Sequence, residues 1–410
     1  MQKQTRIYDP IHGFIEITPL MKQLIDTEEF QRLRDLKQLG ATSFVFPSAN
    51  HTRFEHSIGV SHLAGKMIES IRKNNPELKI TDRQIELTRI SGLLHDIGHG
   101  PYSHLYDDHI KDTKEKDHEE RGCKLIRNMV KKYNLPIKKG EITEIISMIN
   151  PTDTKTKKKT KIWKYQIVAN KVNQLDVDKM DYIQRDCFYL GMKCSGEYSR
   201  LMKDVCVITV GNTKQIAWSI KLQYDIFHLF STRYRLHKTV YNHPKVKAYE
   251  YIIIEILQNL KKNMGGNDIS RTTDSIIYCE MVKNLRRKLY TRQHPKFIGE
   301  FLFTNPQTLK KKEKITNTLI EMNEKTPNLM YQELEIGFAG SKSENPLKNI
   351  NYYNDDSDRF GFKIKPELQS FIIPINFSEK LIRIYCLNRN KEHVDEVYKN
   401  YSQISKIYNS

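Results

Sequence analysis

The sequence has few cysteines and no long apolar run, and both absences narrow the class of protein. The six cysteines, at positions 123, 187, 194, 206, 279 and 386, form no Cys-x-x-Cys pair. Their spacing gives no indication of a zinc finger or a disulfide framework, so reduced thiols are expected. The densest apolar stretch, Tyr251–Leu257, is interrupted by Glu255, and the polar first residues lack the apolar run of a signal peptide. We expect a soluble intracellular protein, in the cytoplasm or the nucleus, with no membrane partner.

The length and net charge of the chain limit its domain organisation and the kinds of partner it can bind. At 410 residues, of which 38% are hydrophobic, the chain is long enough for one large domain with a smaller lobe. The net charge of +18 predicts anionic partners, and nucleotides and single-stranded nucleic acid both qualify. The Lys-rich segment 154–161 is expected to be a surface loop, with polyanion binding as the alternative.

Hydrophobic periodicity predicts a mainly α fold. Apolar residues recur at helical spacing in four segments of the first three quarters of the chain: Leu20–Leu39, Ile58–Ile71, Ile85–Leu94 and Ile142–Ile149. Apolar β-formers on both sides of Gly211-Asn212 predict a small β-hairpin over 205–220. From about Phe301 the composition shifts to Lys, Asn and Ser, which indicates a smaller α+β C-terminal lobe. Within that lobe we predict a strand over 370–375 and a helix over 378–388. The predicted boundaries are a large domain over 1–300 and the lobe over 301–410.

One short motif carries the strongest chemical signal. His95 and Asp96 end an apolar helix, and His99 follows about one turn later. Positions i and i+1 of a helix lie about 100° apart, so both side chains can reach one ion at the helix end. Imidazole and carboxylate together suit Mn, Fe or Zn better than calcium. A capped helix with a buried histidine is the alternative for this pair alone, but His56 upstream and Asp178 downstream sit in similar apolar helical patterns.

The order His56, His95-Asp96, Asp178 is that of HD phosphohydrolases. With the stretches 30–40, 46–56, 99–104 and 232–237, the sequence resembles the deoxynucleoside triphosphate (dNTP) triphosphohydrolases of the SAM-and-HD-domain family, from Tyr8 to Cys386. The resemblance implies an HD-domain helical core over 1–300, and it does not extend to a SAM domain.

The resemblance also implies roles for individual residues. One divalent metal, Mn, Fe, Mg or Zn, would be held by His56, His95, Asp96 and Asp178, and a second Mg could accompany the triphosphate. The acid/base group would be His104 and His118, with Asp107 to orient the imidazole; a solvated loop histidine is the alternative for His118. The residues implied to bind substrate are Gln38, Leu39, Arg53, His99, Lys179, Tyr182, Asp186, Arg233, His237 and Tyr241.

Spacing supports part of this set independently. Asp178, Lys179, Tyr182 and Asp186 fall on one helical face, and Arg233, His237 and Tyr241 repeat every four residues. By resemblance Tyr182 packs against the deoxyribose and Asp186 accepts from its 3′-hydroxyl. Solvated charges around a core tyrosine are the alternative.

Regulation is where the sequence departs from the family. The family pattern implies a homotetramer, with a dimer as the alternative, and GTP or dNTP activators. The residues that match the activator-binding pattern are Asp26, Gln31, Arg34, Arg200, Lys221, His243 and Arg287. Thr5, Tyr8, Ser219 and Thr291 replace mostly basic or amide residues of the animal enzymes, and Asn242 stands where the family usually has Gln.

Three functions are compatible with these observations. The leading hypothesis is a metal-dependent dNTP triphosphohydrolase that releases deoxynucleoside and triphosphate. The second keeps the HD metal site but acts on another nucleotide phosphoester or an RNA end. The third is a non-catalytic HD protein that binds nucleic acid.

Overall fold

The computed structural model describes residues 5–112, 117–151, 159–194, 198–264, 269–339, 345–354, 361–364 and 376–409. The chain divides into two compact units, and each collects segments that are far apart in the sequence. Unit 1 comprises Met1–Thr232, Asp268–Ile276 and Pro346–Ile372, and unit 2 comprises Arg233–Asn267, Ile277–Asn345 and Ile373–Ser410. A domain boundary at residue 300 stays a prediction.

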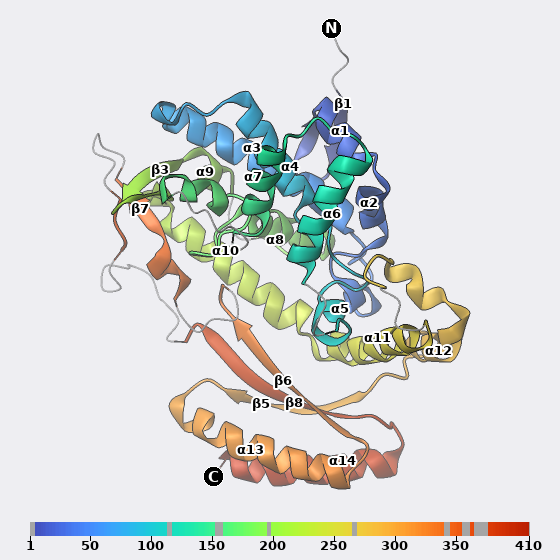
Figure 1. Cartoon of the computed structure of the whole chain (residues 1–410). Coiled ribbons are helices and arrows are strands. Elements are labelled where there is room, and N and C mark those ends of the chain that lie inside the picture. The colour runs from blue at the N-terminus through green and yellow to red at the C-terminus, as the bar shows by residue number, and fades with distance from the viewer. Residues whose placement is uncertain are drawn as a thin grey trace. The chain divides into compact units, whose positions relative to one another are not determined.

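Unit 1 is mainly helical, in agreement with the predicted fold class (Figure 1). Its helices are α1 Pro19–Ile25, α2 Glu28–Gln31, α3 Arg53–Asn74, α4 Asp82–Leu94, α5 His104–His109, α6 His118–Lys132, α7 Lys139–Ile149, α8 Val177–Tyr189 and α9 Tyr198–Lys203, followed by the first part of α10 Gln223–Leu236. Short 3-10 turns lie at η1 Arg32–Asp35, η2 Gly40–Phe44, η3 Pro76–Leu78, η4 Lys159–Gln166, η5 Ile220–Leu222 and η9 Pro346–Asn349, together with the first part of η7 Asp274–Tyr278.

The central element of unit 1 is α3, which packs against both α4 and α8. Its start is fixed by a capping box, in which the side chain of Glu55 reaches back to the backbone N–H of Thr52. Thr81 and Gln84 form the same motif at the start of α4. The two capping boxes therefore fix where α3 and α4 begin.

The predicted helix over 20–39 is interrupted. Thr27 caps α2 by accepting a hydrogen bond from the N–H of Phe30, so the chain turns between α1 and α2. The apolar residues of both pieces still face one core, which explains why the periodicity reads as continuous.

Unit 1 also contains two small sheets. Strands β1 Thr5–Asp9 and β2 Gly13–Ile17 form an antiparallel hairpin. Strands β3 Val205–Val210 and β4 Thr213–Ser219 form the predicted second hairpin, and β7 Asn351–Tyr353 pairs parallel with β4. Gly211 has φ +57°, the left-handed conformation that its turn requires.

Unit 2 is an α+β unit. Its elements are the π-helical turn η6 His237–Tyr241, α11 Pro244–Asn263, η8 Glu280–Val282, α12 Lys283–Tyr290, β5 Lys296–Phe303, α13 Pro306–Lys325, β6 Leu329–Gly337, β8 Ser378–Cys386 and α14 Lys391–Asn409. The strands form an antiparallel sheet in the order β5-β8-β6, and α13 and α14 lie side by side along it (Figure 1).

The predicted helix over 378–388 is wrong, because this segment is strand β8. As the central strand it has neighbours on both edges, and every residue from Leu381 to Cys386 is buried. Burial on both faces removes the alternation that normally identifies a strand. The strand predicted over 370–375 and segment 154–158 of the Lys-rich loop lie outside the described residues.

Candidate metal centre and active site

Three helices bring the predicted metal ligands together. His56 stands in the first turn of α3, His95 follows the last residue of α4 with Asp96 directly after it, and Asp178 lies in the first turn of α8. Since α3 packs on both α4 and α8, these helix ends meet within unit 1. The side chains of His56, His95 and Asp96 are almost fully buried, while that of Asp178 is about one third exposed. The group therefore has one open side.

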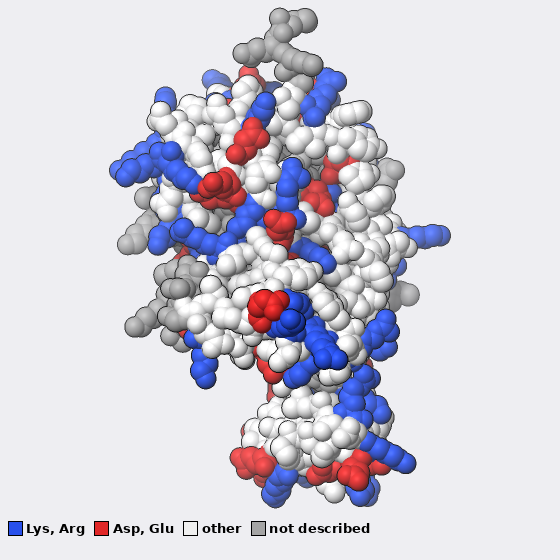
Figure 2. All heavy atoms as spheres, turned by 90° about the vertical axis from the view of Figure 1, so that its right-hand side faces the viewer, with Lys and Arg blue, Asp and Glu red and all other residues white. Residues whose placement is uncertain are grey.

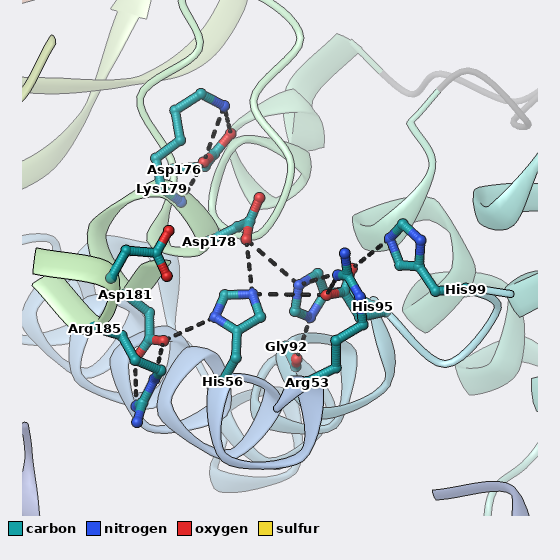
Figure 3. Close-up of polar contacts among 12 residues, drawn as sticks. Arg53, His56, Gly92, His95, His99, Asp176, Asp178, Lys179, Asp181 and Arg185 are labelled. Atoms are coloured by element: carbon teal, nitrogen blue, oxygen red, sulfur yellow. Dashed lines mark hydrogen bonds and ion pairs between the residues drawn. The ribbon is translucent and has the colours of Figure 1, made fainter. Parts of the chain in front are cut away.

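The donor atoms of this group converge on one point (Figure 3). Asp178 Oδ1 lies 3.1 Å from His56 Nε2 and 3.5 Å from His95 Nε2. One atom from each of His56, His95 and Asp178 lies within 4.8 Å of the other two. Asp96 approaches from the fourth side, with its Oδ1 3.4 Å from His95 Nε2 and its Oδ2 3.7 Å from His56 Nε2.

The hydrogen bonds behind the two imidazoles fit a bound cation. His56 Nδ1 lies 2.8 Å from Asp181 Oδ2, and His95 Nδ1 lies 2.8 Å from the carbonyl oxygen of Gly92. Both Nδ1 atoms face acceptors and so must carry the ring proton in a metal-ligating tautomer, which leaves each Nε2 as a lone pair. His95 Nε2 is buried and has no hydrogen-bond partner among the described residues. A buried nitrogen that makes no hydrogen bond and lies 3.4 and 3.5 Å from two carboxylate oxygens suits a divalent-metal site.

The same contacts shift the protonation equilibria of the ligands. Burial opposes the charged form of His56, but the hydrogen bonds with Asp178 and Asp181 outweigh it and raise the pKa to about 10. Burial likewise opposes ionisation of Asp178, and the two histidines hold its pKa well below the usual range. A metal that binds here must therefore displace a proton from His56.

Arg53 joins the metal group to the following loop. Its guanidinium forms an ion pair with Asp96 Oδ2, and its Nε donates to Ser103 Oγ at 2.8 Å. His99 Nε2 lies 3.3 Å from the other oxygen of Asp96. Arg53, which is predicted to bind the substrate phosphates, is thus paired with the predicted metal ligand Asp96.

A second cluster contains the predicted acid/base residues. His118 begins α6, and its Nδ1 lies 2.6 Å from Asp107 Oδ2 on α5. Arg121 donates to the other oxygen of Asp107 at 2.6 Å. The ring of His118 stacks on His99 with centroids 4.0 Å apart, and His104 meets both rings edge-on. Three elements thus hold the candidate proton-transfer groups beside the metal group.

The surroundings of this cluster favour the ionised form of Asp107 and the neutral form of His104. Burial raises the pKa of Asp107, but the hydrogen bonds from His118 and Arg121 outweigh it and lower the pKa to about 2. Desolvation and the positive charges of Arg53 and His118 lower the pKa of His104 to about 4. Asp107 is therefore ionised and His104 neutral near pH 7.

Most of the predicted substrate residues lie in unit 1. Lys179, Tyr182 and Asp186 follow Asp178 along α8. Asp186 is buried and lies 2.7 Å from His51 Nε2, and the ammonium of Lys179 lies 3.3 Å from Asp176 Oδ2. Gln38 and Leu39 lie between η1 and η2 and are half-buried.

The other three predicted substrate residues, Arg233, His237 and Tyr241, lie in unit 2. Arg233 donates to the carbonyl oxygen of Gly337 at 2.8 Å, and the rings of His237 and Tyr241 are 4.8 Å apart. The helix continues past Leu236 as a π-helical turn, which alters the spacing expected of a regular α-helix. Their participation in one pocket with Asp178 stays a prediction.

The predicted activator residues are distributed over both units. In unit 1, Arg34 Nε donates to Gln31 Oε1 at 2.8 Å, and Arg200 forms an exposed ion pair with Asp225 at 3.3 Å. The remaining members are Asp26 and Lys221 in unit 1 and His243 and Arg287 in unit 2. Ordinary surface contacts account for those described, so activator binding stays a prediction.

Sequence reasoning missed the residues behind His56. Asp181 and Arg185 are fully buried on α8, and both side chains contact Asp9 or His12 of the first hairpin. The i, i+4 spacing of Asp181 and Arg185 was visible as an ion pair. Nothing local indicated that the pair is buried or that it meets the predicted metal ligand His56.

Comparison with known proteins agrees with this geometry. Residues 53–186 match the HD domain. The chain is 34% identical to the "Deoxynucleoside triphosphate triphosphohydrolase SAMHD1 homolog" of Dictyostelium discoideum, across 98% of this chain and 81% of that protein. It is 33% identical to the SAMHD1 enzyme of Gallus gallus, across 92% of this chain and 71% of the relative, and 30% identical to that of Homo sapiens, across 93% and 70%. Near-complete coverage at this identity shows that the chain belongs to the SAMHD1 family of HD-domain proteins.

Proposed function

We propose that this protein is a metal-dependent dNTP triphosphohydrolase, which converts a dNTP to its deoxynucleoside and triphosphate. The observation that carries the proposal is the group of donors around the buried Nε2 of His95, which makes no hydrogen bond within the described part of the chain and has His56 Nε2, Asp178 and Asp96 within reach. The relatives in the slime mould, chicken and human are all named as enzymes of this activity.

The chemistry of the donors supports one divalent ion held by His56, His95, Asp96 and Asp178. Two imidazoles and two carboxylates suit Mn, Fe or Zn, and Mg is the oxygen-preferring alternative, also as a second ion with the triphosphate. A bound metal of this kind neutralises charge on the α-phosphate and lowers the pKa of water. Arg53, paired with Asp96, would exchange part of that contact for the substrate phosphates.

The second cluster would move the proton. Ionised Asp107 accepts from Nδ1 of His118, so the opposite nitrogen, Nε2, is the one that can take or give a proton. The pKa of His104 is lowered to about 4, so this histidine is neutral near pH 7 and carries no acidic proton to donate in the free enzyme. We therefore assign proton donation to the leaving group to His118, with His104 and His99 beside it.

Selection of the sugar would fall to α8. Tyr182 and Asp186 lie on the helix that also carries Asp178, one and two turns further on. By the family resemblance, Tyr182 would exclude a 2′-hydroxyl, and Asp186 would accept from the 3′-hydroxyl. Gln38 and Leu39 would meet the sugar and base, and Arg53 and Lys179 would hold the triphosphate.

We propose that the protein is regulated by oligomerisation and by a nucleotide activator. A homo-oligomer, tetramer or dimer, with GTP or a dNTP as activator fits the family pattern at Asp26, Gln31 and Arg34.

None of the helices in the described part of the chain combines the length and apolarity that a membrane crossing needs. On the face drawn in Figure 2, the basic side chains of the described residues lie at many points, with acidic ones among them.

The test is product analysis. Purified protein is incubated with Mn²⁺ and each dNTP, with and without GTP, beside an Asp178→Ala control, and the products are separated by ion-exchange chromatography. Triphosphate and deoxynucleoside formed only by the wild type would establish the reaction. Equal turnover of GTP and dGTP would remove the proposed sugar selection.

Other outcomes would favour the alternative functions. Hydrolysis that does not need a triphosphate would favour another HD phosphohydrolase. Uncut dNTPs, together with nucleic-acid binding that falls steeply with salt, would favour a binding protein.

A further inference from the structure

The metal ligand His56 is held from behind by a buried charge network that reaches the N-terminal hairpin. Asp181 Oδ2 lies 2.8 Å from His56 Nδ1, and Asp181 Oδ1 lies 2.6 Å from His12 Nε2 (Figure 3 shows the His56 side). Arg185 donates to both oxygens of Asp181, at 2.8 and 3.0 Å. Each oxygen of the Asp181 carboxylate thus has two nitrogen contacts, one from Arg185 and one from a histidine, and these four contacts fix its orientation.

The hairpin holds the other end of the network. Arg185 also donates to Asp9 Oδ2 at 2.8 Å. The second oxygen of Asp9 accepts the backbone N–H groups of Ile11 and His12, at 2.8 and 3.0 Å. The turn between β1 and β2 is thereby built around the same arginine that orients Asp181. Asp9, Asp181 and Arg185 are each at most 3% exposed.

A glycine in α3 provides the room for this network. Gly59 follows His56 by about one turn, and a Cβ added at Gly59 would lie 2.0 Å from Asp181 Oδ1 and 2.4 Å from Arg185 Nη2. Both distances are far below contact distance, so the ion pair can lie against α3 only because residue 59 has no side chain. The close approach of the two helices is thus an independent sign that the network is built into the packing.

We propose that Asp181 is a positioning residue for the metal, held in place by Arg185, Asp9 and His12. A carboxylate can only accept, so Asp181 keeps the proton of His56 on Nδ1 and presents Nε2 to the metal as a lone pair. An amide at position 181 could turn its NH2 toward Nδ1 and favour the opposite tautomer. This inference deepens the proposed function and rests on its metal site, not on the identity of the substrate.

The test measures metal affinity rather than turnover. Asp181→Asn is titrated with Mn²⁺ and its metal content measured, beside wild type and Asp186→Asn. Asp186 is the matched control because it is also a buried aspartate on α8 that contacts a histidine, His51, which is not a metal ligand. We expect Mn²⁺ affinity about 10- to 100-fold lower in Asp181→Asn and unchanged in Asp186→Asn. Thermal unfolding without metal checks that each variant folds.

Wild-type Mn²⁺ affinity in folded Asp181→Asn would overturn the proposal, and so would an equal loss in Asp186→Asn. If Asp181→Asn does not fold, His12→Ala decides in its place. This variant leaves Arg185 on Asp181 and should lower Mn²⁺ affinity severalfold; unchanged affinity overturns the proposal. If the wild type does not hydrolyse dNTPs but the variants still show the expected losses of Mn²⁺ affinity, the proposed reaction is refuted and the positioning role of Asp181 stands.

Discussion

Replacement of Gly98 by alanine should damage catalysis through a displacement of about 1 Å. A Cβ at residue 98 would lie 2.1 Å from the carbonyl oxygen of His118 and 2.4 Å from the backbone nitrogen of Gly122. These are backbone atoms and cannot rotate away, so the first turn of α6 must move by about 1.3 Å to regain ordinary contact at 3.4 Å. That movement would open the stack between His118 and His99, now 4.0 Å between centroids.

The expected losses of kcat and of unfolding free energy follow from this displacement. A 1 Å misplacement of a catalytic group costs about 10²-fold in rate, and overpacking costs about 1–3 kcal/mol of unfolding free energy. Gly98→Ala should therefore lose about 100-fold in kcat and about 1–3 kcal/mol in stability, and should keep its bound metal. Steady-state kinetics, urea unfolding and metal analysis measure the three quantities.

Gly122→Ala is the matched control at the same contact. A Cβ at residue 122 would meet its nearest neighbour, the nitrogen of Gly98, at 3.5 Å, which is ordinary contact. Alanine is preferred over glycine in a helix by up to about 1 kcal/mol, so this variant should be as stable as wild type or more so. Wild-type stability and kcat in Gly98→Ala, or equal damage in both variants, would refute the reasoning.

Three further predictions follow from the site and its surroundings. Asp107→Asn should lower kcat by about 10²-fold, because the amide no longer fixes the proton on Nδ1 of His118, while metal content stays at the wild-type level; loss of metal would contradict it. Mn²⁺ at a hundred times its Kd should stabilise the wild type by about 2.7 kcal/mol in urea unfolding, and removal by a chelator should abolish both this gain and hydrolysis; His95→Ala should show no gain. Burial raises the pKa of Asp274 from 3.8 to about 6, so this carboxyl keeps its proton to higher pH in the folded state than in the unfolded chain. Its contribution to stability is therefore full below about pH 4 and lost as pH rises through 6, by at most about 3 kcal/mol, and a pH-independent stability difference between wild type and Asp274→Ala would contradict this.

The predicted metal group could be proposed from sequence because His56, His95-Asp96 and Asp178 follow the HD order and each lies within a local helical pattern. His95 and Asp96 mark the end of α4, and His56 follows the capping box of α3. The roles of Asp176, Asp178 and Asp181 could not be separated in this way. They depend on where α8 begins: Asp176 caps the helix, which turns Asp178 toward the histidine rings and Asp181 toward the back of His56.

Residues joined by long-range packing left no local signal. Asp9 and Arg185 are 176 positions apart, and Gly59 reads as an ordinary helix residue until α8 is placed against it. Strand β8 was predicted as a helix because this central strand is buried on both faces from Leu381 to Cys386 and shows no clear alternation of apolar and polar residues. Candidate ligands on helix ends could thus be proposed from the motif order and the family resemblance, whereas the residues that orient them require the packed structure.

Hydrolysis of a dNTP in ¹⁸O-labelled water tests the central claim most directly. If the metal group directs water to the α-phosphorus with the deoxynucleoside leaving, the triphosphate should carry one ¹⁸O atom and the deoxynucleoside none. Mass spectrometry of the two products, beside His95→Ala and Asp178→Ala, reads the bond choice and its dependence on the metal ligands together. Label in the deoxynucleoside, a deoxynucleoside monophosphate as product, or unchanged turnover in the ligand variants would contradict the account.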